Sequence, residues 1–171
     1  MTRVPSSRLC AAALCLLVLP ALASADGASV KRNAGANPNS PFSSSIWVGD
    51  TLYVSGTLPQ ASKPATAGAP PTIEGDTRAQ TTSALTSIQK TLREQGLDMG
   101  DVIQMRVYLA ADPSLGGKMD FAGMNTAYGQ FFGTKEQPNK PVRTTVQIAA
   151  LALPGALVEI EVTAVRGAAG K

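Results

Sequence analysis

Two stretches with the apolar spacing of helices separate five strand-like runs in this chain of 171 residues. The strand-like runs cover residues 45–48, 51–56, 102–109, 142–151 and 157–166, and the helical spacing covers residues 76–95 and 121–131. Strands favour β-branched residues and alternating polarity, whereas helices repeat apolar residues every three or four positions. The order β-β-α-β-α-β-β predicts an α+β fold, a mixed β-sheet with both helices packed on one face.

The two predicted helices have recognisable signals. Asp76 is placed to cap the first helix, and Gly96 is placed to end it. The apolar stripes are Leu85, Ile88 and Leu92 in the first helix and Phe121, Met124, Tyr128 and Phe131 in the second. The stripe of the first helix is narrow, as suits a helix that lies on a sheet.

One face of the predicted sheet is expected to remain open. A single layer of helices covers the apolar face, which Ile103, Met105, Val107 and Leu109 supply in the central strand. The side chains assigned to the open face are Gln104, Arg106, Tyr108, Arg143, Thr145, Gln147, Glu159 and Glu161. Because this face is polar and uncovered, it is expected to form a subunit interface or a wall of a ligand site.

The start of the chain has the pattern of an export signal. A basic beginning and an apolar run at residues 9–22 precede Ala23-Ser24-Ala25, a small-x-small cleavage pattern. We expect residues 1–25 to be removed as a signal peptide, residues 26–40 to form a flexible leader and residues 41–167 to form one domain. The mature protein is expected to be periplasmic or secreted, with no membrane attachment.

Composition excludes several kinds of chemistry. Both cysteines fall within the predicted signal peptide, and the chain has no histidine. The mature chain therefore lacks the usual zinc ligands, a thiol nucleophile and a Ser-His pair, so we expect no metal site. Removal of the signal leaves 13 of the 15 basic residues and all 12 acidic residues. This near-neutral balance argues against nucleic acid as a partner, because that affinity comes from many phosphate contacts.

Arg143 and Glu159 are the leading catalytic candidates. They stand in the last two predicted strands, which a short turn at residues 153–155 joins, so we expect them on neighbouring strands. A guanidinium can hold a carboxylate with two parallel hydrogen bonds, and a glutamate can orient a water molecule. The pair points to a small carboxylate substrate.

These assignments have structural alternatives. Arg143 could pair with Glu159 or Glu161 in a cross-strand salt bridge, and either carboxylate could be only a solvated charge. Tyr128 could belong to the core, because its spacing is that of a packed helix face. Asn125 could cap its helix or bridge between subunits.

Five short motifs in order carry a family resemblance. They are Pro41-Phe42, Val54-Ser55-Gly56-Thr57-Leu58-Pro59, Asn125-Thr126-Ala127-Tyr128-Gly129-Gln130-Phe131-Phe132, Pro141-Val142-Arg143-Thr144-Thr145-Val146 and Val158-Glu159-Ile160-Glu161-Val162. In order and spacing they resemble the RidA/YjgF family of reactive-intermediate deaminases. The resemblance implies a chorismate-mutase-like fold and a homotrimer with a pocket at each subunit interface. It also implies hydrolysis of short 2-imino acids to 2-keto acids and ammonia, without cofactor or metal.

The resemblance also implies a set of site residues. The positions that match the substrate pocket of the family are Ser55, Gly56, Asn125, Tyr128, Arg143, Thr145 and Glu159. Phe42 stands where the archetypal deaminases carry a tyrosine, so a contact by that hydroxyl is absent. Ser55 has no histidine partner and is expected to hydrogen-bond substrate or backbone.

Three classes of function are compatible with these residues. The first is an exported imine deaminase, and the second is a binding module with the same pocket but no turnover. The third is a structural or chaperone-like trimer whose polar sheet face serves only for assembly.

Overall fold

The computed structural model describes residues 27–35, 37–62 and 71–170. The predicted signal peptide lies outside the described residues, and so do residues 63–70. The strands are β1 (Val30–Asn33), β2 (Ser45–Val48), β3 (Thr51–Thr57), β4 (Val102–Leu109), β5 (Val142–Gln147) and β6 (Val158–Val165). The helices are α1 (Thr77–Glu94) and α2 (Phe121–Tyr128), with 3-10 turns at Met99–Asp101 and Pro113–Leu115. Among the described residues, no helix has both the length and the apolar character needed to span a membrane.

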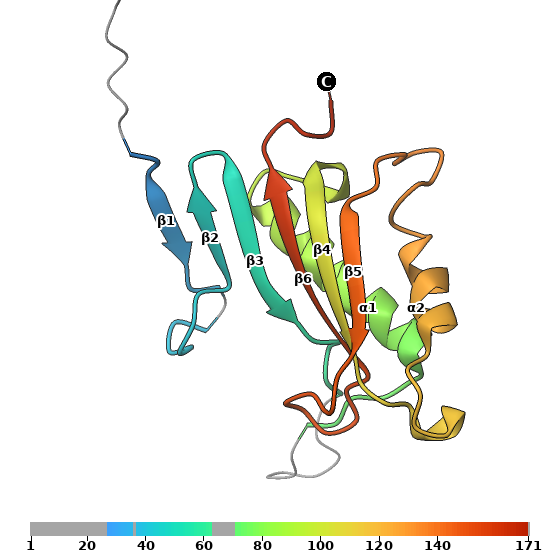
Figure 1. The fold of residues 1–171 in the computed structure, drawn as a ribbon. Helices are drawn as coiled ribbons and strands as arrows, with labels where there is room; N and C mark the ends of the chain where they lie inside the picture. Colours follow the sequence, from blue (N-terminus) through green and yellow to red (C-terminus); the bar gives the residue numbers. More distant parts are fainter. Residues whose placement is uncertain (1–26, 36, 63–70, 171) are drawn as a thin grey trace, which may run out of the picture.

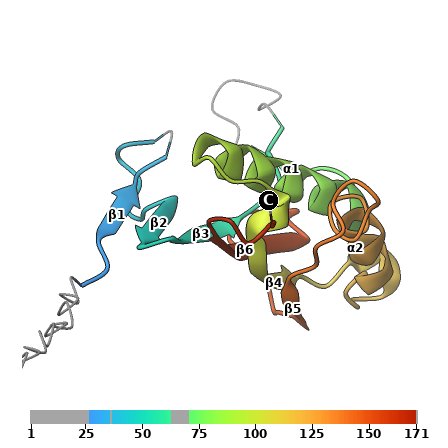
Figure 2. The same ribbon diagram turned by 90° about the horizontal axis from the view of Figure 1, so that it is seen from above.

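The strands form one six-stranded sheet in the order β1-β2-β3-β6-β4-β5 (Figure 1). Neighbouring strands are antiparallel except β4 and β5, which are parallel. Both helices lie on the same side of this sheet, as the view from above shows (Figure 2). The predicted α+β class, with a mixed sheet and helices on one face, is confirmed.

Helix α1 forms where the capping signals predict it. The Asp76 carboxylate accepts a hydrogen bond from the backbone N–H of Ala79 and so caps the first turn. Gly96 has a positive φ of 75°, a conformation that ends helices and favours glycine. Helix α2 is shorter than predicted, because it ends at Tyr128 and leaves Phe131 in the following turn.

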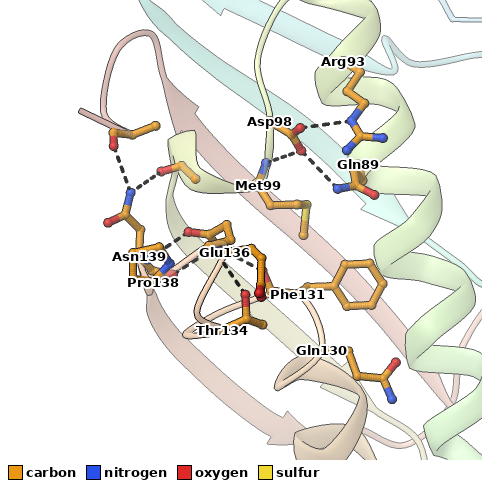
Figure 3. Close-up of a pocket in the computed structure, with 13 residues that line it drawn as sticks. Gln89, Arg93, Asp98, Met99, Gln130, Phe131, Thr134, Glu136, Pro138 and Asn139 are labelled. Atoms are coloured by element: carbon orange, nitrogen blue, oxygen red, sulfur yellow. Dashed lines mark hydrogen bonds and ion pairs between the residues drawn. The ribbon is translucent and has the colours of Figure 1, made fainter. Parts of the chain in front are cut away.

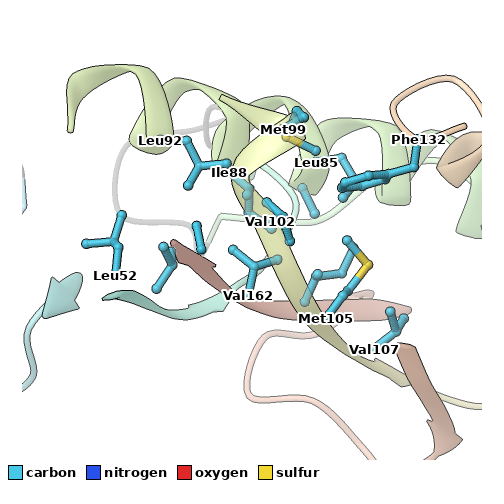
Figure 4. Close-up of a cluster of buried hydrophobic side chains, with 14 of the residues drawn as sticks. Leu52, Leu85, Ile88, Leu92, Met99, Val102, Met105, Val107, Phe132 and Val162 are labelled. Atoms are coloured by element: carbon cyan, nitrogen blue, oxygen red, sulfur yellow. The ribbon is translucent and has the colours of Figure 1, made fainter. Parts of the chain in front are cut away.

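The apolar core lies between the helices and the sheet (Figure 4). Leu85, Ile88 and Leu92 of α1 are fully buried against it, as their spacing predicts. The prediction for Ile103 is wrong, because its side chain is 44% exposed. A register shift between Val102 and Gln104 interrupts the pairing of β4 with β6, and Val102 is buried in place of Ile103.

The sequence prediction of a flexible leader misses strand β1. Val30–Asn33 lies within residues 26–40 and pairs antiparallel with β2. Three of its four residues are exposed, so the strand carries no apolar alternation that a sequence pattern could reveal. Backbone pairing with β2 and side-chain hydrogen bonds from Asn33 to Ser45 and Gln95 hold the strand in place, rather than apolar burial.

The prediction that the last two strands lie next to each other in the sheet is also wrong. Helix α2 carries the chain from β4 to β5, and this crossover sets β5 parallel to β4 at the sheet edge. Residues 148–157 then carry the chain back, and β6 pairs with β3 on one side and β4 on the other. β4 therefore separates β5 from β6.

Candidate functional site

Arg143 and Glu159 lie on opposite faces of the sheet. Arg143 is the register partner of Met105, whose buried side chain faces the helices. Glu159 is the register partner of Tyr108 on the face that no helix covers. The prediction that the two residues share the open face on neighbouring strands is therefore wrong, and β4 lies between their strands.

Thr145 and Gln147 were also predicted on the open face, and they too lie on the helix side. They pair with Val107 and Leu109 of β4, whose side chains are buried beneath the helices.

Helix α2 holds the guanidinium of Arg143 with neutral groups. Arg143 Nη2 donates a hydrogen bond of 2.7 Å to Asn125 Oδ1, and Nη1 lies 3.7 Å from the sulfur of Met124. The guanidinium carbon lies 4.4 Å from the centre of the Tyr128 ring and 5.8 Å from that of Phe121. We call Arg143, Asn125, Tyr128 and Phe121 the arginine half-site.

The arginine half-site follows from helix geometry. Phe121, Asn125 and Tyr128 are spaced four and three residues apart, so they lie along one side of α2. Sequence reasoning missed Phe121 as a neighbour of Arg143, although its spacing from Tyr128 placed both on one stripe. The ring of Tyr128 also stacks on Phe132, with 4.8 Å between centroids, and so joins the half-site to the core.

Electrostatics within the arginine half-site favour an anionic ligand. Among the described residues, Arg143 makes no ion pair, so its charge is available to a ligand. Burial raises the pKa of Tyr128, and the positive charge of Arg143 offsets part of this rise. The Tyr128 hydroxyl therefore stays protonated near neutral pH and can act as a hydrogen-bond donor.

Thr145 stands two positions along β5 from Arg143, on the same face. Its hydroxyl oxygen is buried and has no hydrogen-bond partner among the described residues. A buried hydroxyl without a partner is unfavourable in a finished structure. The position of Thr145 beside Arg143 thus fits a group that a ligand or a second chain satisfies.

A β-bulge shapes the second group of predicted residues. Between Val54 and Thr57 the pairing of β3 with β6 shifts register, and Ser55 and Gly56 occupy the irregular stretch. A side chain at Gly56 would collide with the carboxylate of Glu159. Phe42, Ser55, Gly56 and Glu159 together line a pocket of about 240 Å³, which we call the glutamate half-site.

Ser55 anchors the loop that carries Phe42. Its hydroxyl donates a hydrogen bond of 2.7 Å to the backbone oxygen of Ser43, and its N–H donates to the oxygen of Ser44. The Phe42 side chain remains 65% exposed. The expected hydrogen bond from Ser55 to backbone is therefore present, and Phe42 offers the pocket only an apolar wall.

The salt-bridge alternative for Arg143 is excluded. Glu161 pairs instead with Arg106 on the open face, with 2.6 Å between Nη1 and Oε1. The Tyr108 hydroxyl lies 3.4 Å from the same Glu161 oxygen. Burial and the charge of Glu161 raise the pKa of Tyr108. Among the described residues, Glu159 forms no ion pair.

The pocket of the glutamate half-site is small, and larger hollows lie elsewhere. A cleft of about 560 Å³ opens between α1, the turn at Met99–Asp101 and the loop before β5 (Figure 3). A groove of about 770 Å³ runs between β1 and α1. Neither contains a residue of the two half-sites. In the part of the chain that the structure describes, no three His, Cys, Asp or Glu side chains gather as metal ligands.

Comparison with known proteins agrees with the fold and the motifs. The family model described as Endoribonuclease L-PSP matches residues 33–166. A RutC family protein of Pyrococcus horikoshii is 32% identical over 127 residues, which are 74% of this chain and 88% of that protein. TdcF of Escherichia coli K12, named as a candidate reactive intermediate deaminase, is 32% identical over 128 residues, 75% of this chain and 88% of TdcF.

Solved structures give the same result. The structure of E. coli TdcF with bound serine has a TM-score of 0.58 and 31% identity, and the match covers 79% of this chain and 94% of TdcF. A member of the YjgF/YER057c/UK114 family from Mycobacterium tuberculosis has a TM-score of 0.60 and 26% identity, over 80% of this chain and 99% of that protein. The chain therefore belongs to the Endoribonuclease L-PSP family, which is the RidA/YjgF family that its motifs resemble.

Proposed function

We propose that the protein hydrolyses small reactive 2-imino acids to 2-keto acids and ammonia, in active sites shared between neighbouring subunits of a homotrimer. The observation that carries this proposal is that the Arg143 guanidinium is held in place by neutral groups. Its guanidinium is fixed by Asn125 and the ring of Tyr128, and among the described residues it has no carboxylate partner. Such a group is ready to bind the carboxylate that every 2-imino acid carries.

The chemistry needs only a bound carboxylate and a directed water. In the proposed step the water oxygen bonds to the imine carbon, and Glu159 takes one water proton and passes it to the nitrogen. The resulting hydroxyl then gives its proton to the nitrogen, the carbon–nitrogen bond breaks, and ammonia and a 2-keto acid leave. General acid–base assistance of this kind contributes about 10²- to 10⁴-fold.

The opposite orientation of the two half-sites supports a shared site. In one chain Arg143 faces the helices and Glu159 faces the open side, so one substrate cannot reach both. A head-to-tail contact would bring the arginine half-site of one subunit to the glutamate half-site of the next. Head-to-tail contacts form a ring when the rotation between subunits closes, and a ring of three subunits is what the family resemblance implies. The structure of TdcF with bound serine supports a small carboxylate ligand for this chain too.

Ammonia release tests the proposal. The purified mature protein should accelerate ammonia release from freshly generated 2-iminobutyrate or 2-iminopropionate, and Arg143→Ala should abolish the acceleration. Arg78→Ala is a matched control, because Arg78 is an exposed arginine of α1 away from both half-sites. A wild-type protein that leaves the rate of ammonia release unchanged would contradict the proposal.

A second candidate, a binding module without turnover, rests on the glutamate half-site. Phe42 brings no hydroxyl, and the Ser55 hydroxyl already donates to the Ser43 backbone oxygen. The pocket thus has few groups that could give a proton to the departing nitrogen. Calorimetry with 2-keto and 2-amino acids on the wild type and on Arg143→Ala distinguishes the candidates, because binding that depends on Arg143 without ammonia release indicates the module.

The family description also names an endoribonuclease, which we do not propose for this chain. The chain contains no histidine, the usual acid–base group near neutral pH. For the mature protein we propose export to the periplasm or the medium, as its first 25 residues predict. Detection of the full-length form in the cytosol alone would contradict this.

A further inference from the structure

The cleft of about 560 Å³ is a binding site candidate that the proposed function does not use (Figure 3). Its walls come from the second half of α1, from the turn at Met99–Asp101 and from the loop at residues 130–139. The volume lies within the usual range for sites that bind small molecules. None of its residues belongs to either half-site, so occupancy of the cleft and of the proposed active site can be measured separately.

Side-chain amides hold the loop wall of the cleft in place. Gln137 Nε2 donates to the backbone oxygens of Phe131 and Asn139, and its N–H donates to the Thr134 hydroxyl. Asn139 Nδ2 donates to the backbone oxygen of Gly100, in the adjoining turn at Met99–Asp101. These bonds define the wall before any ligand arrives, as is usual for small-molecule sites.

The helix wall presents a guanidinium that a carboxylate keeps in position. Arg93 Nε donates a hydrogen bond of 3.0 Å to Asp98, and Gln89 Nε2 donates to the same carboxylate. Burial acts in the opposite direction, but hydrogen bonds from Met99 N–H, Gln89 and Arg93 hold the pKa of Asp98 below its ordinary value. Asp98 therefore stays charged, and the two Nη groups of Arg93 make no hydrogen bond among the described residues.

The loop wall presents a charge of the opposite sign. Glu136 lines the cleft, is exposed and forms no ion pair within the described part of the chain. Apolar surface from Phe131 and Pro138 lines the same cleft. The cleft thus combines the Arg93–Asp98 ion pair, in which the Nη groups of Arg93 remain available, with a second carboxylate at Glu136 and an apolar surface.

We infer that this cleft binds a small zwitterion with an apolar side chain, an amino acid or a short peptide. The ligand carboxylate would bind the Nη groups of Arg93, the ammonium group would bind Glu136, and the side chain would pack on Phe131. A ligand with only one of these charges would leave the opposite wall without a partner, so both charges are needed for full affinity.

Calorimetric titration of the Arg143→Ala protein tests this inference. That background removes the carboxylate-binding group of the proposed active site, so the heat reports on the cleft. L-phenylalanine and L-alanyl-L-phenylalanine are the probes, one for the amino acid and one for the peptide. The expected result is saturable binding of at least one probe, with 3-phenylpropionate and 2-phenylethylamine each binding about fivefold more weakly or worse.

Substitutions in the cleft assign the binding to its two walls. Arg93→Gln and Glu136→Gln should each weaken binding of the zwitterion by about fivefold or more. Arg78→Gln and Glu94→Gln are the matched controls, because both lie on α1 and neither lines the cleft. The controls should leave the affinity unchanged.

Two outcomes would overturn the inference. One is the lack of binding by either probe at about 10 mM, and the other is binding that neither Arg93→Gln nor Glu136→Gln weakens. With Arg143 intact, both cleft variants should retain ammonia release. If the imine assay fails while the titration succeeds, only the proposed function is contradicted.

Discussion

The carboxylate of Glu159 on β6 occupies the space in which a side chain at Gly56 on β3 would lie. The backbone at Gly56 does not have a positive φ, so the need for glycine comes from this contact and not from the chain conformation. The bulge between Val54 and Thr57 brings the two residues together at the sheet surface. Gly56 therefore determines where the proposed base can stand.

Gly56→Ala is expected to displace the Glu159 carboxylate and to lower kcat for imine hydrolysis by about 10²-fold or more, as loss of a positioned base does. Gly129→Ala is the matched control, because Gly129 has helical φ and a side chain there meets only ordinary contacts. Steady-state ammonia release from both variants measures the effect. Equal rates for Gly56→Ala and wild type would exclude Glu159 as the base in its present position.

Arg143→Ala removes the proposed carboxylate partner without exposing a buried acid. A hydrogen-bonded contact to a charged group contributes about 1.5–3 kcal/mol, so 2-keto acid product should bind about 10- to 100-fold more weakly. Arg143→Lys should recover only part of this loss, because an ammonium group cannot form two parallel hydrogen bonds. Calorimetry with 2-ketobutyrate checks both variants. Full recovery by lysine would show that charge alone suffices.

Thr145→Val replaces the buried hydroxyl that lacks a partner with a methyl group of similar size. The free energy of unfolding of the separate subunit should stay constant or rise, because no hydrogen bond is lost. Urea denaturation measures this quantity. A loss of more than about 1 kcal/mol would mean that the hydroxyl has a partner within the folded subunit.

The burial pattern of β4 gives a prediction about stability. Leu109→Ala should lower the free energy of unfolding by about 2–5 kcal/mol, because Leu109 is fully buried. Ile103→Ala should cost less than about 1 kcal/mol in the separate subunit, because the register shift leaves Ile103 largely exposed. Similar losses for both variants would place Ile103 in the core after all.

Local sequence patterns predicted the helices and strands well where capping or apolar spacing alone determines the element. Asp76 and Gly96 bound α1 as their capping roles predict, and the alternation at residues 102–109 coincides with β4. In each case the signal lies within a few residues of the chain. Ile103 shows the limit, because a one-residue shift against β6 is a property of the pair of strands.

Long-range pairing could not be predicted in the same way. The sequence around residues 148–157 resembles a hairpin connection, yet β5 follows α2 to the sheet edge and β6 enters between β3 and β4. Apolar spacing reports which residues are buried and not which strand lies alongside. Strand β1 was missed for a related reason, since its three exposed residues carry no burial signal.

The sequence predicted which residues form the candidate site, but it did not predict how they are arranged in space. The motifs identified Arg143 and Glu159, but only the strand order shows that they face opposite sides of the sheet. Phe121 was identified as part of a helix stripe, and its nearness to Arg143 depends on how α2 crosses β5. A site shared between two copies of the chain, as proposed above, would leave no signature in the residue spacing within one copy.

Trimers refolded from two variants test the proposed shared site most directly. Arg143→Ala and Glu159→Gln proteins should each be inactive in ammonia release, because every site lacks one of the two groups. When the two variants are unfolded together and refolded as an equal mixture, about a quarter of the sites should combine an intact Arg143 with an intact Glu159 from the neighbouring subunit. The mixture should then recover about a quarter of the wild-type rate. A mixture that remains inactive, although refolded wild-type protein is active, would contradict a site built from two subunits.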